Sequence, residues 1–169
     1  MKGLPVLITL IGLCFQLNAQ AIAYQSLPIP ETRPGLDILL HYSSPRDEVI
    51  IQDGKLTHIA RKFHYDESRP YVATPVAVTQ QTVADGIPLN GRQLTALKEM
   101  IKGSDFLYLP ENTYGAPEGD RSYDYSLRIK AEGHEKAVSY RSTPSYANAP
   151  APFERMQEYI WKLVTEAEQ

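Results

Sequence analysis

The sequence predicts an α+β domain, with an antiparallel sheet of about four to six strands and two helices packed on one face. Three observations predict this fold. Runs of alternating apolar and polar residues precede and separate two amphipathic helical segments. Asp-Gly and Glu-Gly pairs join consecutive runs, as in β-hairpins. Each helical segment has a single apolar stripe, so both helices are expected on the same face of the sheet.

The sequence pattern of the first half of the domain predicts strands. Residues 36–43 alternate between apolar and polar side chains. An Asp-Gly pair at 53–54 separates two β-prone runs and favours a tight hairpin turn, because both central positions take positive φ. Residues 61–70 are polar and predict a loop or a strand end. The Val- and Thr-rich stretch 72–83 contains Pro75, which restricts it to an edge strand or an extended connection.

The first helix is predicted at residues 89–103. Asn90 is suited to cap its start, and Gly103 to close its end in a left-handed conformation. The apolar run 106–109 that follows fits either a short strand or the point where the helix meets the sheet.

A second hairpin is predicted from residue 123 to residue 141, with Glu-Gly at 132–133 as its turn. Its alternation places Tyr123, Tyr125 and Tyr140 on the apolar face, so these tyrosines are expected in the core.

The last helix is predicted at residues 152–166. Pro152 fits the first turn of a helix, where its missing N–H has no acceptor to lose. The helix has one apolar stripe, formed by Phe153, Met156, Ile160, Leu163 and Val164.

The N-terminus, residues 1–23, has the three parts of a secretory signal peptide. Lys2 supplies a positive charge, residues 4–17 are apolar, and small residues precede a cleavage point after Ala21 or Ala23. We therefore expect a secreted or periplasmic bacterial protein, without a transmembrane segment once the signal is removed.

Residues 24–35 contain three prolines and predict a linker, and residues 36–169 then form a single domain. The only cysteine, Cys14, lies in the signal segment, so no disulfide or thiolate chemistry is expected after export. The formal net charge is −3, and loss of Lys2 makes it −4. An acidic chain gives no electrostatic reason to expect nucleic acid as a partner.

The sequence predicts no catalytic, cofactor or metal site. It lacks His-Glu-x-x-His, Gly-x-Ser-x-Gly and Gly-rich phosphate-loop patterns. His41 and His58 are expected on the polar faces of predicted strands and His134 in a turn, none at ligand spacing. His64 belongs to a polar His-Tyr-Asp-Glu stretch that fits a solvated loop better than a ligand set. We therefore expect a protein that is not an enzyme.

The long acidic loop 111–121 is the best candidate for contacts with a partner. Tyr114 and Tyr146 lie in irregular segments, where a tyrosine provides apolar area and a hydroxyl group. With the carboxylates of Glu118 and Asp120, they form the predicted contact residues. Carboxylate oxygens also suit calcium, although the spacing does not match a known calcium loop, so cation binding is left open.

One resemblance adds to this interpretation. The stretch LNGRQLTALKEMIKGSDFLYL, the hairpin DRSYDYSLRIKAEGHEKAVSYRS and the closing amphipathic helix resemble small exported bacterial α+β proteins with the order hairpin, helix, hairpin, helix. Emfourin-like inhibitors of thermolysin-type metalloproteases have a similar order of elements. This chain departs from them in its signal peptide and its longer Pro-rich middle, so the resemblance implies a fold class and no inhibitory residue.

These observations favour an exported, non-enzymatic domain that binds a protein or peptide, with protease inhibition as one form of that function. One alternative is a small ligand-binding or hydrolytic envelope protein with a pocket between sheet and helices. Another is a structural component of the cell envelope.

Overall fold

The computed structural model describes residues 38–146 and 148–168. The chain divides into two compact units, and every described residue belongs to the second, Glu31–Gln169. The predicted signal peptide (1–23) and linker (24–35) lie outside the described residues. No helix in the described ranges is long and apolar enough to cross a membrane.

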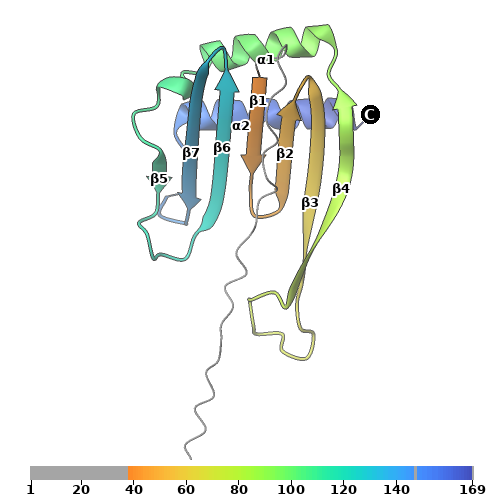
Figure 1. Cartoon of the computed structure of the whole chain (residues 1–169). Helices are drawn as coiled ribbons and strands as arrows, with labels where there is room; N and C mark the ends of the chain where they lie inside the picture. The colour runs from red at the N-terminus through yellow and green to blue at the C-terminus, as the bar shows by residue number, and fades with distance from the viewer. Residues whose placement is uncertain (1–37, 147, 169) are drawn as a thin grey trace, which may run out of the picture. The chain divides into compact units, whose positions relative to one another are not determined.

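The described residues form an α+β fold, with one mixed sheet and two helices (Figure 1). The order of strands across the sheet is β4-β3-β2-β1-β6-β7-β5. The strands are β1 (Ile38–Ser43), β2 (Asp47–Gln52), β3 (Lys55–His64), β4 (Ala77–Pro88), β5 (Thr113–Gly115), β6 (Tyr123–Ala131) and β7 (His134–Ser142). The helices are α1 (Gly91–Gly103), α2 (Ala151–Ala167) and a short 3-10 helix (Phe106–Tyr108).

The α+β class is confirmed, but the prediction of four to six antiparallel strands is wrong. The described residues form seven strands, and β5 runs parallel to β7. Strand β5 has three residues, too few to show an alternation of apolar and polar side chains. The sequence therefore predicted an irregular loop there. Gly115 permits its close approach to β7, since a Cβ atom there would lie 2.1 Å from the carbonyl oxygen of Arg141.

Both predicted hairpin turns are confirmed. Asp53 and Gly54 have φ angles of 51° and 70°, and Glu132 and Gly133 have φ angles of 50° and 79°. Two consecutive positive φ angles match the twist of the flanking strands. These turns set the registers of β2 with β3 and of β6 with β7.

Helix α1 begins as predicted and ends differently. Asn90 and Gln93 form a reciprocal capping box, in which the Gln93 amide donates to Asn90 Oδ1 at 3.0 Å and the Asn90 amide donates to Gln93 Oε1 at 2.9 Å. The left-handed cap predicted at Gly103 is wrong, because Gly103 is still helical. Ser104 ends the helix in a right-handed conformation, and Asp105 takes the left-handed one, with φ of 63°.

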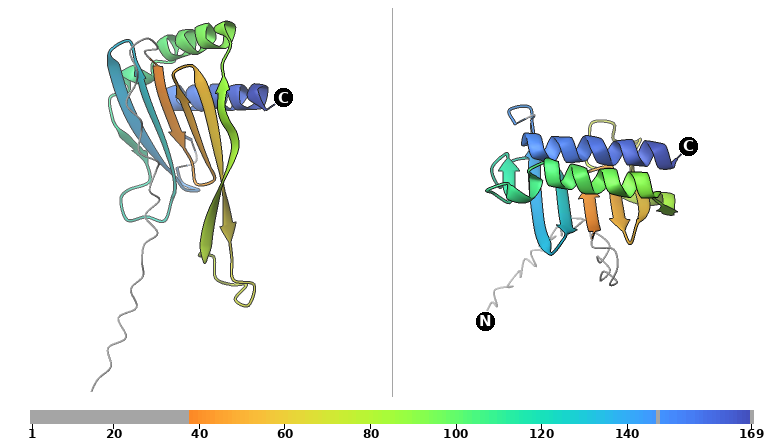
Figure 2. Two further views of the ribbon diagram at one scale, coloured as in Figure 1. Left: turned by 45° about the vertical axis from the view of Figure 1, so that its right-hand side comes forward. Right: turned by 90° about the horizontal axis from the view of Figure 1, so that it is seen from above.

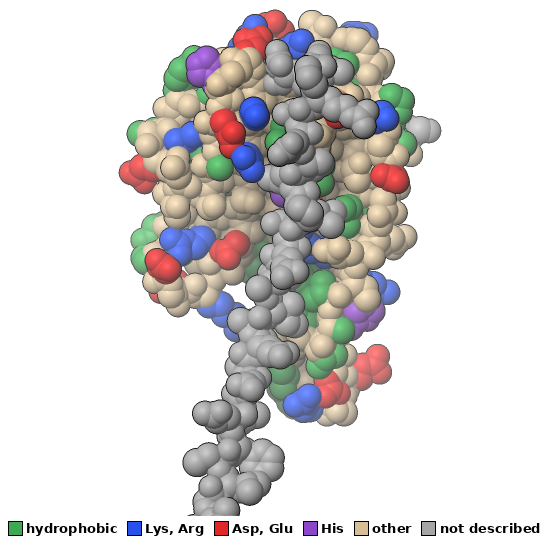
Figure 3. All heavy atoms as spheres, in the orientation of Figure 1, with side chains coloured by type: hydrophobic (Ala, Val, Ile, Leu, Met, Phe, Trp, Pro, Cys, Tyr) green, Lys and Arg blue, Asp and Glu red, His purple; other side chains and the backbone are tan. Residues whose placement is uncertain are grey.

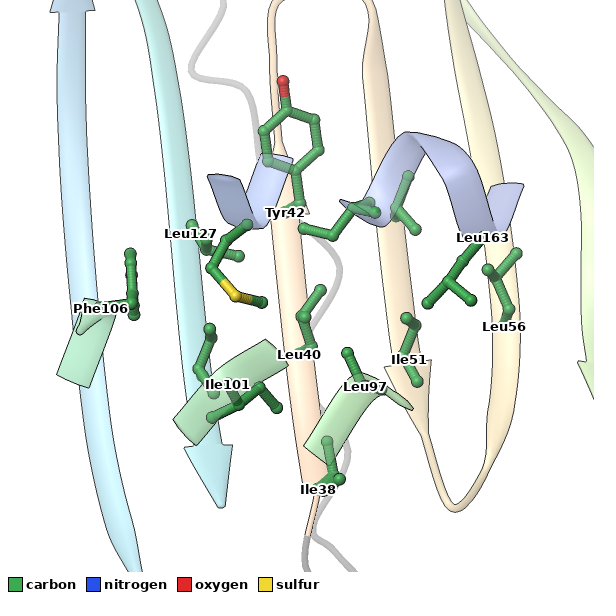
Figure 4. Packing of buried hydrophobic residues seen from close by; sticks show 14 of the residues in the cluster. Ile38, Leu40, Tyr42, Ile51, Leu56, Leu97, Ile101, Phe106, Leu127 and Leu163 are labelled. Atoms are coloured by element: carbon green, nitrogen blue, oxygen red, sulfur yellow. The ribbon is translucent and has the colours of Figure 1, made fainter. Parts of the chain in front are cut away.

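The core lies between one face of the sheet and the two helices, which cover the same face (Figure 2). Side chains from β1, β2 and β6 point toward Leu97 and Ile101 of α1 and Leu163 of α2 (Figure 4). All five residues of the predicted α2 stripe are buried, and Pro152 lies in the first turn of this helix. The apolar stripes therefore predicted the helix packing correctly.

The three tyrosines of the second hairpin differ in burial. Tyr140 is buried, and Tyr125 packs partly buried against it, with ring centroids 6.0 Å apart. Tyr123 is 67% exposed, so its assignment to the core is wrong. Strand β1 ends opposite Ser126, and Tyr123 therefore extends beyond the part of the sheet that β1 supports.

Candidate protein-binding surface

Strands β3 and β4 continue beyond the rest of the sheet. The first residue of β2, Asp47, pairs with Ala60, so residues 61–64 of β3 pair only with residues 77–80 of β4. Residues 61–80, named the arm here, consist of this two-stranded ribbon and the loop that joins it. The arm projects past the ends of the other strands (Figure 1). The loop or strand end predicted at 61–70 is therefore a strand as far as His64.

The arm carries four of the eight large hydrophobic side chains that are exposed among the described residues. Tyr71 is 98% exposed, and Tyr65 and Val76 are each more than half exposed. Val72 is the fourth, at 43%. Figure 3 shows hydrophobic side chains along the arm beside charged side chains of both signs at its tip. Tyrosine beside apolar and charged groups is typical of surfaces that bind proteins.

Local hydrogen bonds stabilise the loop at the tip of the arm. The Asp66 carboxylate accepts bonds from the Ser68 hydroxyl at 2.6 Å, the Ser68 amide at 3.0 Å and the Arg69 Nε at 2.6 Å. These bonds lower the pKa of Asp66, with the Ser68 hydroxyl as the largest cause. The Val76 amide closes the loop by donating to the His64 carbonyl at 2.8 Å. An ordered loop loses less conformational entropy when it binds a partner.

A buried carboxylate lies at the base of the arm. Glu48 of β2 is fully buried and points to the face of the sheet away from the helices, as do His41 of β1 and Arg61 of β3. Its Oε1 lies 2.7 Å from His41 Nε2, and its Oε2 accepts a bond from an Arg61 guanidinium nitrogen at 2.8 Å. Each partner is a diagonal neighbour on an adjacent strand, within reach of long side chains.

Arg61 also ties the arm to the turn between β1 and β2. Its guanidinium donates to the Ser44 carbonyl at 2.6 Å, and its amide donates to the Arg46 carbonyl at 2.6 Å. Within that turn, the Ser44 hydroxyl accepts a bond from the Asp47 amide at 2.9 Å. The first residue of the arm is therefore held by both its side chain and its backbone.

The environment of Glu48 keeps its carboxylate ionised. The hydrogen bond from His41 is the largest cause of a lowered pKa, and the charges of His41 and Arg61 add to it. Burial acts in the opposite direction, because it disfavours the charged form. These interactions outweigh burial, so the pKa of Glu48 lies below its ordinary value although its side chain is buried.

The sequence did not identify this cluster. It placed His41 and His58 on polar faces, but both are buried, at 8% and 7% exposure. His58 lies on the helix-covered face, where its Nδ1 is 2.8 Å from Glu168 and its Nε2 is 3.2 Å from Asp47. Its ring also meets the edge of Trp161, with centroids 5.6 Å apart. A charged residue at the start of a Val-Ile-Ile run was the one available signal for Glu48.

The four predicted contact residues lie near the β5–β7 edge, at the opposite end of the strand order from the arm. Glu118 and Asp120 are exposed in the loop after β5, and Tyr146 is 45% exposed after β7. Tyr114 is half-buried in β5, and its hydroxyl accepts a bond from the Glu111 amide at 3.1 Å. Tyr114 therefore supports the fold of the loop. The exposed Tyr123 is a residue at this edge that the sequence analysis missed.

No metal centre forms among the described residues, since no group of three His, Cys, Asp or Glu side chains is placed to hold an ion. The carboxylates of loop 111–121 are accordingly not gathered around one point. Within the same ranges, the hydrogen bonds of His41 and His58 are to carboxylates, while His64 bonds the Thr79 hydroxyl across the arm at 2.9 Å. These histidines fasten neighbouring segments together.

No protein-family model matches the sequence, and no curated protein matches it. The geometry of the described residues is therefore the basis for a functional proposal.

The buried carboxylate can be tested by replacing Glu48 with glutamine. The variant removes the charge of the fully buried Glu48 and breaks its ion pair with Arg61, so we expect the free energy of unfolding to fall by about 3–5 kcal/mol. The matched control is Glu135→Gln, which breaks the exposed ion pair with Arg128 and should cost about 1 kcal/mol or less. Urea denaturation measures both. Equal losses in the two variants would contradict a special role for Glu48.

Low pH should remove the contribution of the Glu48 carboxylate to the free energy of unfolding. A carboxylate with a lowered pKa stabilises the fold fully above its ordinary value of 4.5, and this stabilisation is lost as the pH falls from there through the folded pKa. We therefore expect the stability difference between wild type and Glu48→Gln to be large at neutral pH and to shrink in acid. A difference that stays constant between about pH 7 and pH 3, measured by denaturation, would contradict this account.

Proposed function

We propose that this protein is an exported, non-enzymatic domain that binds another protein through the tip of its arm. The single observation that carries the proposal is Tyr71, which is almost fully exposed on a hydrogen-bonded loop that projects from the sheet (Figure 1). Tyr65, Val72 and Val76 of the same arm are also exposed, and exposed apolar side chains that lie together mark surfaces that bind other proteins. Tyrosine anchors such contacts because it combines apolar area with a hydrogen-bonding group.

The chemistry of the tip favours a protein partner over a small molecule. Tyr65, Tyr71, Val72 and Val76 are exposed on the arm, which protrudes beyond the other strands of the sheet (Figure 1). Small-molecule sites are concave and bury most of their ligand. The paired charges of Asp66 and Arg69 beside these side chains provide the polar rim that protein interfaces have.

Export is proposed from the N-terminal pattern of residues 1–23, which has the charge, the apolar length and the small residues of a signal peptide. The partner is then another secreted or periplasmic protein. A secreted protease is one such partner, and an ordered projecting loop has a shape that suits insertion into a protease cleft. If the partner is a protease, the resemblance to emfourin-like inhibitors suggests a metalloprotease of the thermolysin type. Inhibition of such a protease is a prediction.

The proposal predicts that the arm tip carries most of the binding energy. A photo-cross-linking residue placed at position 71 should capture one exported protein, and the same residue at the exposed Tyr108 should not. With the captured partner, Tyr71→Ser plus Val72→Ser should weaken binding by roughly 30-fold or more, as expected when a hot spot is lost. Calorimetric titration measures the change.

The matched control is Tyr123→Ser plus Tyr146→Ser, at the opposite edge of the sheet. This variant also removes two exposed hydrophobic side chains, and it should bind like wild type. If the control variant loses binding and the arm variant does not, the binding site lies at the β5–β7 edge, as predicted from the sequence. Absence of any partner for the wild type would contradict the proposed function. Inhibition assays with thermolysin-type proteases test its narrower form separately.

A further inference from the structure

The long outer edge of β4 is a second surface with interaction chemistry. Strand β4 has 12 residues and pairs with β3 on one side. On its other side it has no neighbouring strand among the described residues, because it ends the strand order. Every second residue therefore presents its backbone N–H and C=O groups outward. The opposite edge strand, β5, has only three residues.

Strand β4 lacks most of the usual protection of an edge between Ala77 and Thr82, where its register with β3 is regular, and the irregularities of that register begin beyond Thr82. Natural edge strands carry lysine, proline or inward-pointing charges that discourage pairing with another chain. Residues 77–84, AVTQQTVA, have no charged residue, no proline and no glycine. Asp85 is the only charged residue in the whole strand. The side chains of residues 79–83 are all exposed, so nothing on this edge repels an approaching strand.

A further strand paired with β4 would stabilise the arm. Its ribbon consists of residues 61–64 and 77–80, and apart from the bond of the Arg61 amide to Arg46 these residues pair only with each other. A two-stranded ribbon is marginally stable in water, and a third strand is usually needed for independent stability. The hydrogen bonds of Glu48 and Arg61 hold the base of the ribbon, but they do not reach its outer end at His64 and Ala77.

We propose that a second copy of this chain supplies the third strand, with the two β4 strands paired antiparallel across a two-fold axis near Gln80 and Gln81. An antiparallel arrangement places residues 77–80 of one arm beside residues 81–84 of the other copy. Each ribbon thereby gains its third strand from the sheet of its partner. The dimer joins the two seven-stranded sheets into one continuous sheet.

Self-pairing fits the charge and the symmetry of this edge. In either register around Gln80 or Gln81, the facing side chains are threonine, glutamine, valine and alanine, apart from Asp85 at the end. No like charges therefore meet along the centre of the interface. A two-fold contact uses the same edge of both copies, so it closes at a dimer and leaves no free β4 edge. Pairing of β4 with β5 would offer only three residues.

This dimer is independent of the proposed function, because the contact lies along residues 77–84 and the arm tip lies at residues 65–76. A dimer presents two arm tips that point in opposite directions. It therefore gives a partner with two copies of the same epitope an increased avidity without any new contact.

The test is the mass of the purified protein in solution, by light scattering and sedimentation over a range of concentrations. Wild type should form a dimer. Thr79→Lys plus Gln81→Lys places lysines opposite one another and should raise the dimer dissociation constant about tenfold or more. The matched control, Asn112→Lys plus Thr113→Lys, adds the same charge at the β5 edge and should leave the dimer unchanged. Circular dichroism verifies that each variant is folded.

A charge swap separates pairing from damage to the arm. Thr79→Glu plus Gln81→Glu loses the bond between Thr79 and His64, as the lysine variant does. Its like charges also face one another across the two-fold axis, so this variant alone should be monomeric as well. Mixed with the lysine variant, it should restore a one-to-one dimer, because the facing charges become opposite. A wild type that is monomeric at its highest soluble concentration would overturn the proposal. So would a dimer broken by the β5 control, or a mixture that stays monomeric.

Discussion

The carboxylate of Glu48 is fully buried between three strands, and the position of the arm depends on how that charge is neutralised. An anion removed from water is strongly unfavourable unless cationic groups and hydrogen bonds replace its hydration. Here the replacements come from opposite sides, with His41 on β1 and Arg61 on β3. A shift of either strand by one residue would turn its side chain to the other face, so the buried charge also fixes the strand register.

The two faces of the sheet have different physical roles. On one face, apolar side chains pack against α1 and α2, and this core provides most of the stability. On the other face, the Glu48 cluster connects the turn between β1 and β2 to the first residue of the arm. The ribbon beyond this cluster has few supports of its own. Its tip is ordered by local bonds around Asp66, and its outer edge is open to a further strand.

Much of the fold was predictable from local chemistry. The Asp-Gly and Glu-Gly turns, the Asn90 cap and the α2 stripe each follow from interactions between residues close in the sequence. Strand β5 was not predictable in this way, because its three residues join the sheet by pairing with β7. Gly115 pairs with Arg141, which is 26 residues further along the chain. The exposure of Tyr123 depended on where β1 ends, which alternation within β6 does not encode.

The candidate site was predicted less well than the fold. Tyr114 has the composition of a contact residue, yet its hydroxyl is used within its own loop. Tyr71 lies in a segment that has no periodicity, and only the pairing of β3 with β4 shows that it stands on a projecting ribbon. Burial of Glu48 likewise requires three strands to meet. Long-range pairing therefore decided which polar and aromatic residues became available for function.

Native-state hydrogen exchange of the Glu48→Gln variant tests the central claim most directly. If the buried carboxylate holds the arm, amides of the ribbon at residues 62–64 and 78–80 should lose much more protection than amides of β6 and β7. The Glu135→Gln control should leave the ribbon unchanged. A uniform loss of protection across the whole sheet would contradict the claim, because Glu48 would then support the fold in general and not the arm.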